Sequence, residues 1–277
     1  VQVIPYVWDE LSGYWYWDMW TGIYIYTDAA GNYDIGGLSS GTYRVRFADW
    51  SGQYATEYYN DQPSLEAAED LAVIAGQAVT GIDASLAEAG HIQGRVTGPG
   101  GVTPLEDIYV NAYVRNGTGG WDSVGSSTGV DGSYDIGGLS AGTYRVQFWD
   151  WSGQYVGEYY SDKPSLDAAD DIIVAAGQTV TAIDATLAEA GRIQGRVTGP
   201  GGLTPLENIQ VVAYALNGGG GWDWFRDSYT DGNGDYDIGG LSSGTYRVEF
   251  YDGSGIHITE YYNNQPNLDS GDDIPVI

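Results

Sequence analysis

Apolar and polar residues alternate with a period of two along much of the chain. In residues 43–47, the apolar Tyr43, Val45 and Phe47 are separated by two arginines. The same alternation is found in residues 82–86 and 108–114. Because successive side chains of a strand leave opposite faces, this pattern predicts strands buried on one face. Glycine-rich stretches separate these segments at short intervals, so we expect many short, mainly antiparallel strands in an all-β sandwich.

A helix is favoured only in residues 63–70. Ser64 can cap this segment, and its alanine and glutamate residues are good helix formers. Similar segments follow Pro164 and, in weaker form, Pro266. The sequence therefore predicts one or two helical turns at each of these places.

The chain repeats itself three times. Residues 33–47 return as residues 134–148 and again as residues 236–250. A period of about 100 residues is one domain per repeat and is too long for a solenoid unit. We therefore predict three tandem β-sandwich domains, of about seven strands each, at residues 1–89, 90–190 and 191–277.

The repeated segment carries a resemblance to known families. The pattern Gly-x-Tyr-x-Ile-x-x-Leu-x-x-Gly-x-Tyr-x-Val begins at Gly31, Gly132 and Gly234, and the strand Ile-Gln-Gly-Arg-Val occurs at residues 92–96 and 193–197. Both resemble the carboxypeptidase regulatory-like and collagen-adhesin B-type domains. The resemblance implies a transthyretin-like Greek-key sandwich that serves as a spacer, a stalk or an accessory domain.

The first and third repeats each lack a strand that the second repeat contains. Residues 1–7 align with residues 108–114, so the first repeat has no counterpart of residues 91–96. The third repeat has no counterpart of residues 180–187. Either the chain is an excerpt of a longer array, or neighbouring subunits donate the missing strands. The predicted strand-pairing edges are Val1, Val3, Val7, Ile274 and Val276.

Composition and charge exclude several classes of protein. The 277 residues include 43 glycines and no cysteine, and the formal net charge is −28. Such an acidic surface repels nucleic acid, and the lack of cysteine excludes disulfides and thiolate metal sites. No apolar run is long enough for a membrane span. This composition suits an extracellular, cell-surface or secreted prokaryotic protein.

The connection between the second and third repeats is short. Residues 187–193 contain no Ser/Gly tract and no proline-rich spacer. Three domains joined in this way would form a rod on the order of 100 Å long.

No set of residues predicts catalysis. Glu57, Glu158 and Glu260 recur at the same place in each repeat, as a structural role requires. His91 and His257 occupy non-equivalent positions, and neither belongs to a pattern typical of a catalytic triad. We predict that the protein is not an enzyme and needs no cofactor.

A calcium site is one interpretation of an acidic loop in the third repeat. Oxygen-bearing side chains occur at alternate positions of this loop, as they do in calcium loops: Asp231, Asn233, Asp235 and Asp237. The favoured interpretation is a tight hairpin turn that uses Asp, Asn and Gly for their backbone freedom.

Aromatic residues cluster in one stretch of each repeat. Six tryptophans are candidates for an interface or for glycan binding: Trp15, Trp17, Trp20, Trp121, Trp222 and Trp224. Exposed indole rings stack on sugars or on other proteins, but the same rings can instead pack against their own domain. Asn116 begins a lone glycosylation sequon.

These observations predict a non-enzymatic extracellular structural protein. It would be a stalk or the subunit of a cell-surface filament. In one version of this hypothesis, copies of the chain assemble with one another by strand donation. The alternative is a glycan-binding accessory region of a larger secreted enzyme or adhesin.

Overall fold

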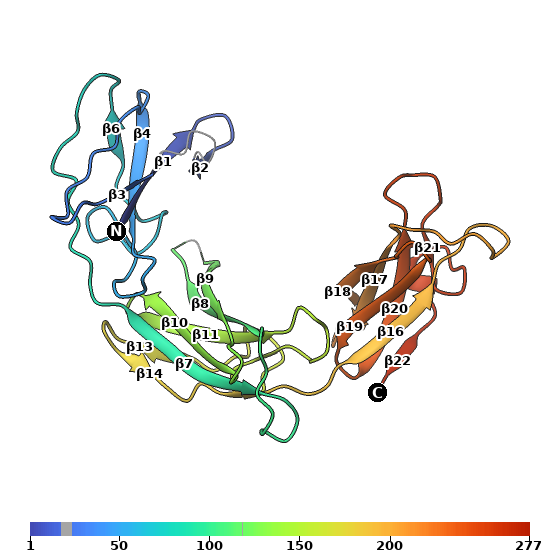
Figure 1. The fold of residues 1–277 in the computed structure, drawn as a ribbon. Helices are drawn as coiled ribbons and strands as arrows, with labels where there is room; N and C mark the ends of the chain where they lie inside the picture. The colour runs from blue at the N-terminus through green and yellow to red at the C-terminus, as the bar shows by residue number, and fades with distance from the viewer. Residues whose placement is uncertain (18–23, 118) are drawn as a thin grey trace. The chain divides into compact units, whose positions relative to one another are not determined.

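The computed structural model describes residues 1–17, 24–117 and 119–277 of an almost entirely β protein (Figure 1). Its strands run from β1 to β22, and the helix among the described residues is the short 3₁₀ helix Leu268–Ser270. This confirms the predicted all-β class. No helix in the described part of the chain is long and apolar enough to cross a membrane.

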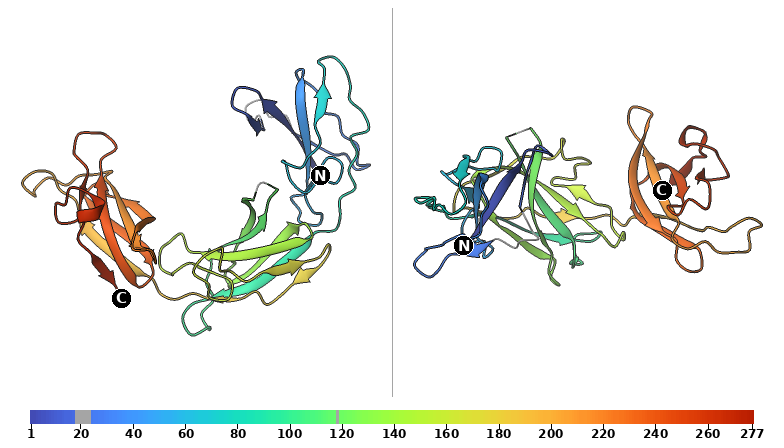
Figure 2. Two further views of the ribbon diagram at one scale, coloured as in Figure 1. Left: turned by 180° about the vertical axis from the view of Figure 1, so that it is seen from behind. Right: turned by 90° about the horizontal axis from the view of Figure 1, so that it is seen from above.

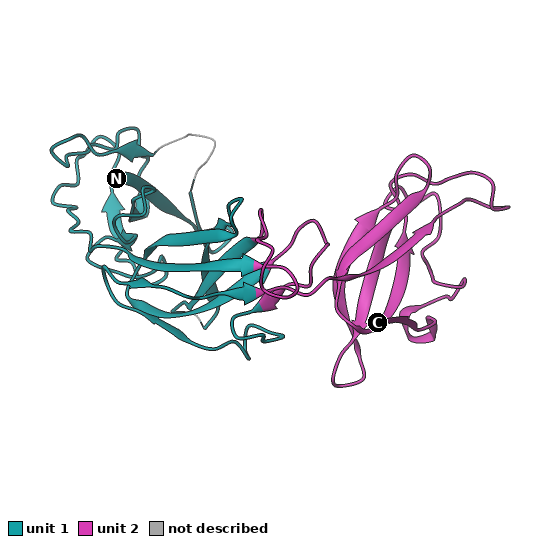
Figure 3. Ribbon diagram, turned by 60° about the horizontal axis from the view of Figure 1, so that its bottom comes forward, with its two compact units in different colours: residues 1–96, 109–148, 159–185 teal, residues 97–108, 149–158, 186–277 magenta. Residues whose placement is uncertain are grey.

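The chain forms two compact units (Figure 3). Unit 1 contains Val1–Val96, Tyr109–Phe148 and Tyr159–Ala185, and unit 2 contains Thr97–Ile108, Trp149–Glu158 and Thr186–Ile277. The strands of both units can be followed in two further views (Figure 2). Residues 1–89, 90–190 and 191–277 are called the first, second and third repeat.

The second repeat contains two sheets. The first has the order β10-β7-β14, with β15 also paired to β7, and the second has the order β12-β11-β8-β9, with β13 on β11. The ring of Tyr134 on β10 contacts the ring of Phe148 on β11 at 6.0 Å between centroids. The strands are β7 (Gly90–Thr97), β8 (Tyr109–Arg115), β9 (Trp121–Ser127), β10 (Ser133–Leu139), β11 (Gly142–Trp149), β12 (Glu158–Tyr159), β13 (Ile172–Val174), β14 (Thr179–Val180) and β15 (Ala185–Thr186).

The third repeat also packs two sheets on one core. A two-stranded sheet, β16-β19, faces a five-stranded sheet of order β18-β17-β20-β21, with β22 on β20. Ile193, Ile238 and Leu241 of the small sheet pack against Val211 and Tyr246 of the large one. The strands are β16 (Gly191–Arg196), β17 (Gln210–Leu216), β18 (Trp222–Tyr229), β19 (Asp235–Leu241), β20 (Gly244–Tyr251), β21 (Glu260–Tyr261) and β22 (Ile274–Val276).

The first repeat has a single sheet among its described residues. This six-stranded sheet has the order β2-β1-β4-β5, with β3 on β1 and β6 on β4. Residues 33–38 and 82–86, the counterparts of β10 and of the β14–β15 region, lie in no strand. The strands are β1 (Gln2–Asp9), β2 (Tyr14–Tyr16), β3 (Ile25–Tyr26), β4 (Gly41–Ala48), β5 (Glu57–Tyr58) and β6 (Leu71–Val73).

Two sequence-based expectations for the first repeat are therefore wrong. The alternation in residues 82–86 does not produce a strand. The equivalent segment of the second repeat contains β15, which pairs with β7, and no described strand of the first repeat lies beside residues 82–86. Val3 and Val7 do not lie at an open edge. Val3 pairs with Ile25 on one side and Phe47 on the other, and Val7 pairs likewise with β2 and β4. The segments that lack strand partners are residues 33–38 and 82–86, which form a second layer packed against this sheet.

The helical segments shrink to single turns that arginines hold in place. In the first repeat the Ala68 N–H donates to the Ser64 carbonyl at 3.1 Å, and the Ala67 N–H lies 3.3 Å from the Ser64 hydroxyl that caps the turn. Arg44 donates to the carbonyls of Leu65 and Glu66. Arg145 and Arg247 make the same contacts in the other repeats.

A candidate strand-binding groove in the first repeat

A groove of about 880 Å³ lies between the sheet of the first repeat and the two segments that carry no strand. Its floor is the inner face of β4, with Tyr43, Val45 and Phe47. Residues 31–38 and 76–84 line its two sides, together with Val1 and Leu86. The groove therefore has an apolar floor, and its walls are two segments that lie in no strand.

Two apolar residues beside the groove are more exposed than their counterparts in the other repeats. Ile35 is half-buried, whereas its counterparts Ile136 and Ile238 are each only 1% exposed. Leu86 is also half-buried, whereas its counterpart Leu187 is 0% exposed. In the second repeat, β7 lies between the two equivalent segments and pairs with both. The groove thus corresponds to the position of β7.

A tyrosine joins the two sides of the groove. The Tyr33 hydroxyl donates to the Ile82 carbonyl, just as the Tyr134 hydroxyl donates to the Ile183 carbonyl at 2.6 Å in the second repeat. Burial, and to a smaller extent the charge of Asp83, raise the pKa of Tyr33 to about 12. The phenol is therefore protonated at neutral pH and can act as a donor.

The other predicted edge residues lie in the third repeat. Ile274 and Val276 belong to β22, which pairs with β20 at Tyr246 and Gly244. β16 pairs with β19 alone among the described residues of this repeat. The unpaired side of β16 is the side on which β14 and β15 pair with β7 in the second repeat.

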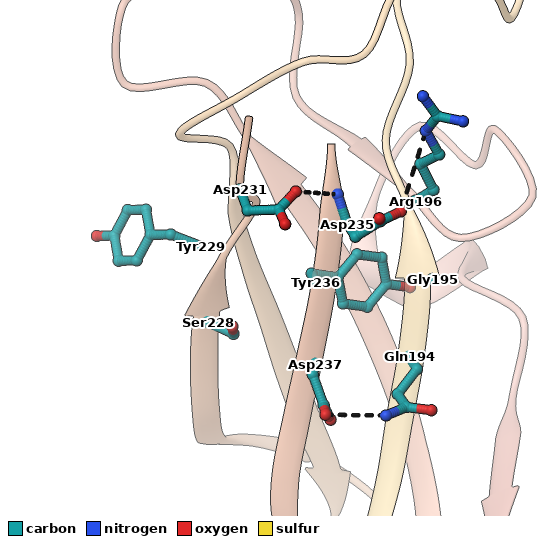
Figure 4. Close-up of a pocket in the computed structure, with 9 residues that line it drawn as sticks. All are labelled: Gln194, Gly195, Arg196, Ser228, Tyr229, Asp231, Asp235, Tyr236 and Asp237. Atoms are coloured by element: carbon teal, nitrogen blue, oxygen red, sulfur yellow. Dashed lines mark hydrogen bonds and ion pairs between the residues drawn. The ribbon is translucent and has the colours of Figure 1, made fainter. Parts of the chain in front are cut away.

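Three of the four residues predicted to bind calcium, Asp231, Asp235 and Asp237, line a shallow pocket of the third repeat (Figure 4). One Asp231 carboxylate oxygen accepts the N–H groups of Asn233 and Asp235, and these hydrogen bonds lower the pKa of Asp231. Asp237 pairs with Arg192 at 2.7 Å and accepts from Gln194 at 2.8 Å. The side chains thus serve a turn and an ion pair, and no cluster of three potential metal ligands occurs among the described residues.

Three of the six candidate tryptophans are covered by arginines of their own sheets. The guanidinium groups of Arg44, Arg115 and Arg247 lie 4.3, 3.9 and 4.2 Å from the ring centroids of Trp15, Trp121 and Trp222, respectively. One face of each of these indole rings therefore makes a cation–π contact within its own sheet, which stabilises the domain.

The remaining aromatic and sequon residues differ in their surroundings. Trp17 contacts Tyr24 edge to face, whereas Trp224 is 61% exposed. Trp20 lies outside the described residues. The Asn116 side chain accepts the Gly120 N–H at 2.8 Å and donates to Asp122 at 3.1 Å. Glycan binding and glycosylation stay predictions.

The histidines and the recurring glutamates are held separately. His91 pairs with Asp135 at 2.8 Å, and His257 pairs with Asp252 at 2.9 Å. Glu57, Glu158 and Glu260 each begin a two-residue strand: β5, β12 or β21. The structure brings none of these groups together into a shared cluster within the described part of the chain.

A buried aspartate organises the loop that follows β11. The Asp150 carboxylate accepts the N–H groups of Ser152, Gln154 and Tyr155, each at 2.8 Å. Burial raises the pKa of Asp150, but the hydrogen bonds from the Ser152 side chain and these N–H groups outweigh it, so the net pKa is lowered. The stabilisation is present above the unfolded pKa of about 4 and is lost as the pH falls through the folded pKa.

We expect Asp150→Asn to reduce the free energy of unfolding by about 1–2 kcal/mol at pH 7, because an amide oxygen is a weaker acceptor of these N–H bonds. The difference from wild type should shrink as the pH falls below about 4. Urea unfolding at several pH values measures it. Asp162→Asn, in an exposed turn, is the matched control. A deficit that stays constant from pH 7 to pH 2 would contradict this role of the carboxylate.

Comparison with known proteins gives similarity to pilins at low identity. The chain matches no protein-family profile and no curated protein. A streptococcal ancillary pilin is 13% identical over 100% of this chain and 88% of that chain, with a TM-score of 0.35. The minor pilin of Streptococcus agalactiae is 13% identical over 68% of this chain and 90% of that chain, with a TM-score of 0.27.

A third similar structure is the shaft pilin SpaA from Lactobacillus rhamnosus GG. It is 10% identical over 65% of this chain and 94% of that chain, with a TM-score of 0.28. Likeness at these levels assigns neither a family nor a function to the chain.

Proposed function

We propose that this chain is a non-enzymatic structural protein of the cell surface, a stalk or filament subunit whose first repeat accepts a β-strand from a second copy. The observation that carries the proposal is the groove between residues 33–38 and 80–86. Its two sides correspond to segments that pair with β7 in the second repeat. An added strand would restore this pairing and cover the apolar floor.

The backbone of the second repeat indicates how such a strand would pair. β7 pairs with β10 in antiparallel register, with Tyr134 opposite Gly94 and Asp135 opposite Gln93. On its other side β7 pairs in parallel with β14, with Val180 opposite Ile92. A strand in the groove would thus gain partners along both edges, as a central strand does. Satisfying those backbone groups while covering apolar side chains is the basis of strand addition.

A second copy carries strands of the required type. The sequence Ile-Gln-Gly-Arg-Val occurs twice in each chain, in β7 and at the start of the third repeat. The copy in β16 is paired only with β19 among the described residues, so it must exchange this one pairing for those in the groove. Copies of net charge −28 repel one another, so backbone pairing and apolar burial must supply the attraction. An assembly of this kind joins identical subunits head to tail.

Two measurements on residues 1–277 test the proposal. A fluorescent peptide with the sequence of residues 191–199 should bind the chain in anisotropy titrations, and a scrambled peptide should not. Analytical ultracentrifugation should show concentration-dependent association that the unlabelled peptide reverses.

Matched isoleucine variants locate the binding site. Ile35→Glu places a charge in the groove and should abolish binding of the peptide and association of the chain. Ile173→Glu, at an exposed position on β13, should leave both unchanged. Circular dichroism checks that both variants are folded. A chain that stays monomeric at all concentrations, or a peptide that binds Ile35→Glu as well as wild type, would contradict the proposal.

A further inference from the structure

We infer that the groove of the first repeat is selective for a strand with glycine at its centre and a basic residue three positions earlier, as in Arg-Ile-Gln-Gly-Arg-Val. This inference rests on the proposed function, because it assumes that a strand enters the groove. It adds which sequence the groove accepts and which residues make the selection.

The second repeat shows why the central residue is glycine. A Cβ atom on Gly94 would lie 2.0 Å from the Ile183 carbonyl oxygen and 3.1 Å from the ring of Tyr134. These are the two groups that the Tyr134–Ile183 hydrogen bond joins. The bond therefore crosses β7 at Gly94 and leaves room for backbone only.

The first repeat keeps this bridge although no described strand lies beneath it. The Tyr33 hydroxyl donates to the Ile82 carbonyl. The Tyr33 ring contacts the Phe47 ring edge to face at 5.8 Å, and the Tyr134 ring contacts the Phe148 ring at 6.0 Å in the same way. The Tyr33 side chain is therefore held by the same two contacts as Tyr134, one to the facing carbonyl and one to a phenylalanine ring. A strand entering the groove meets the same restriction at the same position.

Asp34 and Asp83 are placed to recognise the residues on either side of the glycine. The counterparts of Asp34 bind the start of the strand: Asp135 contacts His91 at 2.8 Å and Gln93 at 3.0 Å, and Asp237 contacts Arg192 at 2.7 Å. The counterpart of Asp83 is Asp184, which accepts the backbone N–H of Arg95 at 2.8 Å, so Asp83 is placed to bind the strand backbone after the glycine. Asp34 and Asp83 both line the groove.

Charge complementarity follows from these contacts. The groove presents carboxylates, and the strand sequence that begins the third repeat carries Arg192 and Arg196 but no acidic residue. The requirement for glycine excludes most strands by shape, and the Asp34 carboxylate favours a strand with a basic residue near its start. Residues 192–197 of this chain meet both conditions.

Competition with variant peptides tests the selectivity on the intact chain. The parent peptide, residues 191–199, is compared with one carrying Gly195→Ala and one carrying Arg192→Glu. We expect the alanine peptide to bind about 10- to 100-fold more weakly, as overpacking of one methyl group against backbone predicts. We expect about a 10-fold loss for the glutamate peptide, because its new carboxylate faces Asp34.

Two variants of the chain separate the causes. Tyr33→Phe keeps the ring but removes the bridge to Ile82, so the preference for glycine over alanine should fall. Asp34→Asn should weaken discrimination between the parent peptide and the peptide carrying Arg192→Glu, while the glycine preference stays. Equal affinity for the parent and alanine peptides would overturn the selectivity and leave strand binding intact. Failure of every peptide to bind would overturn the proposed function itself.

Discussion

Gly94→Ala is expected to lower the stability of the second repeat by about 3 kcal/mol or more, because β7 has no space for a methyl group at this position. The new Cβ would lie 2.0 Å from the oxygen and 2.6 Å from the carbon of the Ile183 carbonyl. Both atoms belong to the backbone, which cannot rotate away as a side chain can. Relief requires the segment around Ile183 to separate from β7, which breaks the bond from the Ile183 N–H to the Gln93 carbonyl.

The third repeat provides a matched control for this substitution. The three atoms nearest to a Cβ on Gly195 all belong to the Tyr236 side chain, and the closest is its hydroxyl oxygen at 2.7 Å. A half-buried side chain can move, so Gly195→Ala should cost less than Gly94→Ala. Hydrogen exchange of the β7 and β16 amides, measured by mass spectrometry, reports the two repeats separately. Equal losses of protection in the two variants would contradict the explanation by the Ile183 backbone.

Arg145→Ala is expected to reduce the free energy of unfolding by about 2–3 kcal/mol, because one guanidinium group satisfies several acceptors at once. Its Nε donates to Asp171 at 2.7 Å, and its Nη1 donates to the carbonyls of Leu166 and Asp167 at 2.8 and 2.9 Å. The side chain is only 21% exposed, so water replaces these donors poorly. The turn that precedes β13 would lose its attachment to β11.

A lysine at the same position distinguishes shape from charge. Arg145→Lys keeps the positive charge, but one ammonium group cannot reproduce the fork of N–H donors, so most of the loss should remain. Arg196→Ala is the surface control, since its pair with Asp235 spans 4.0 Å and is solvent-exposed. Guanidinium unfolding of the three variants measures the differences. Full stability of Arg145→Lys would show that charge alone matters here.

Local pattern was sufficient to predict much of this fold. The alternation around Val45 is found in β4 and in its counterparts β11 and β20, and residues 108–114 correspond closely to β8. The capped segment at Ser64 forms a turn, as its sequence favours, but one turn is too short to persist without the arginine that holds it. The triple repetition also gives most residues a counterpart in another repeat.

The candidate site was predicted only in part. Within residues 1–277, alignment of the repeats gave no counterpart of residues 91–96 in the first repeat, and the predicted open edge was placed along β1. β1 is paired on both sides, and the space lies in the other layer, between residues 33–38 and 80–86. Alignment identifies a strand without a counterpart, but it does not show which segments pair with that strand in the folded domain. The recurrence of a tyrosine at residues 33, 134 and 236 is a signal that could have pointed to this layer, but the prediction of the open edge did not use it.

By itself, the sequence determined the β class, the internal repetition and the acidic, cysteine-free surface, because these depend on side-chain alternation and composition alone. Tertiary structure decided which segments become strands. Residues 33–38 and 134–139 have the same sequence, yet only the latter form a strand, because only they have β7 beside them. A strand exists through hydrogen bonds to a neighbour, so its formation depends on a partner distant in the chain or supplied by another molecule.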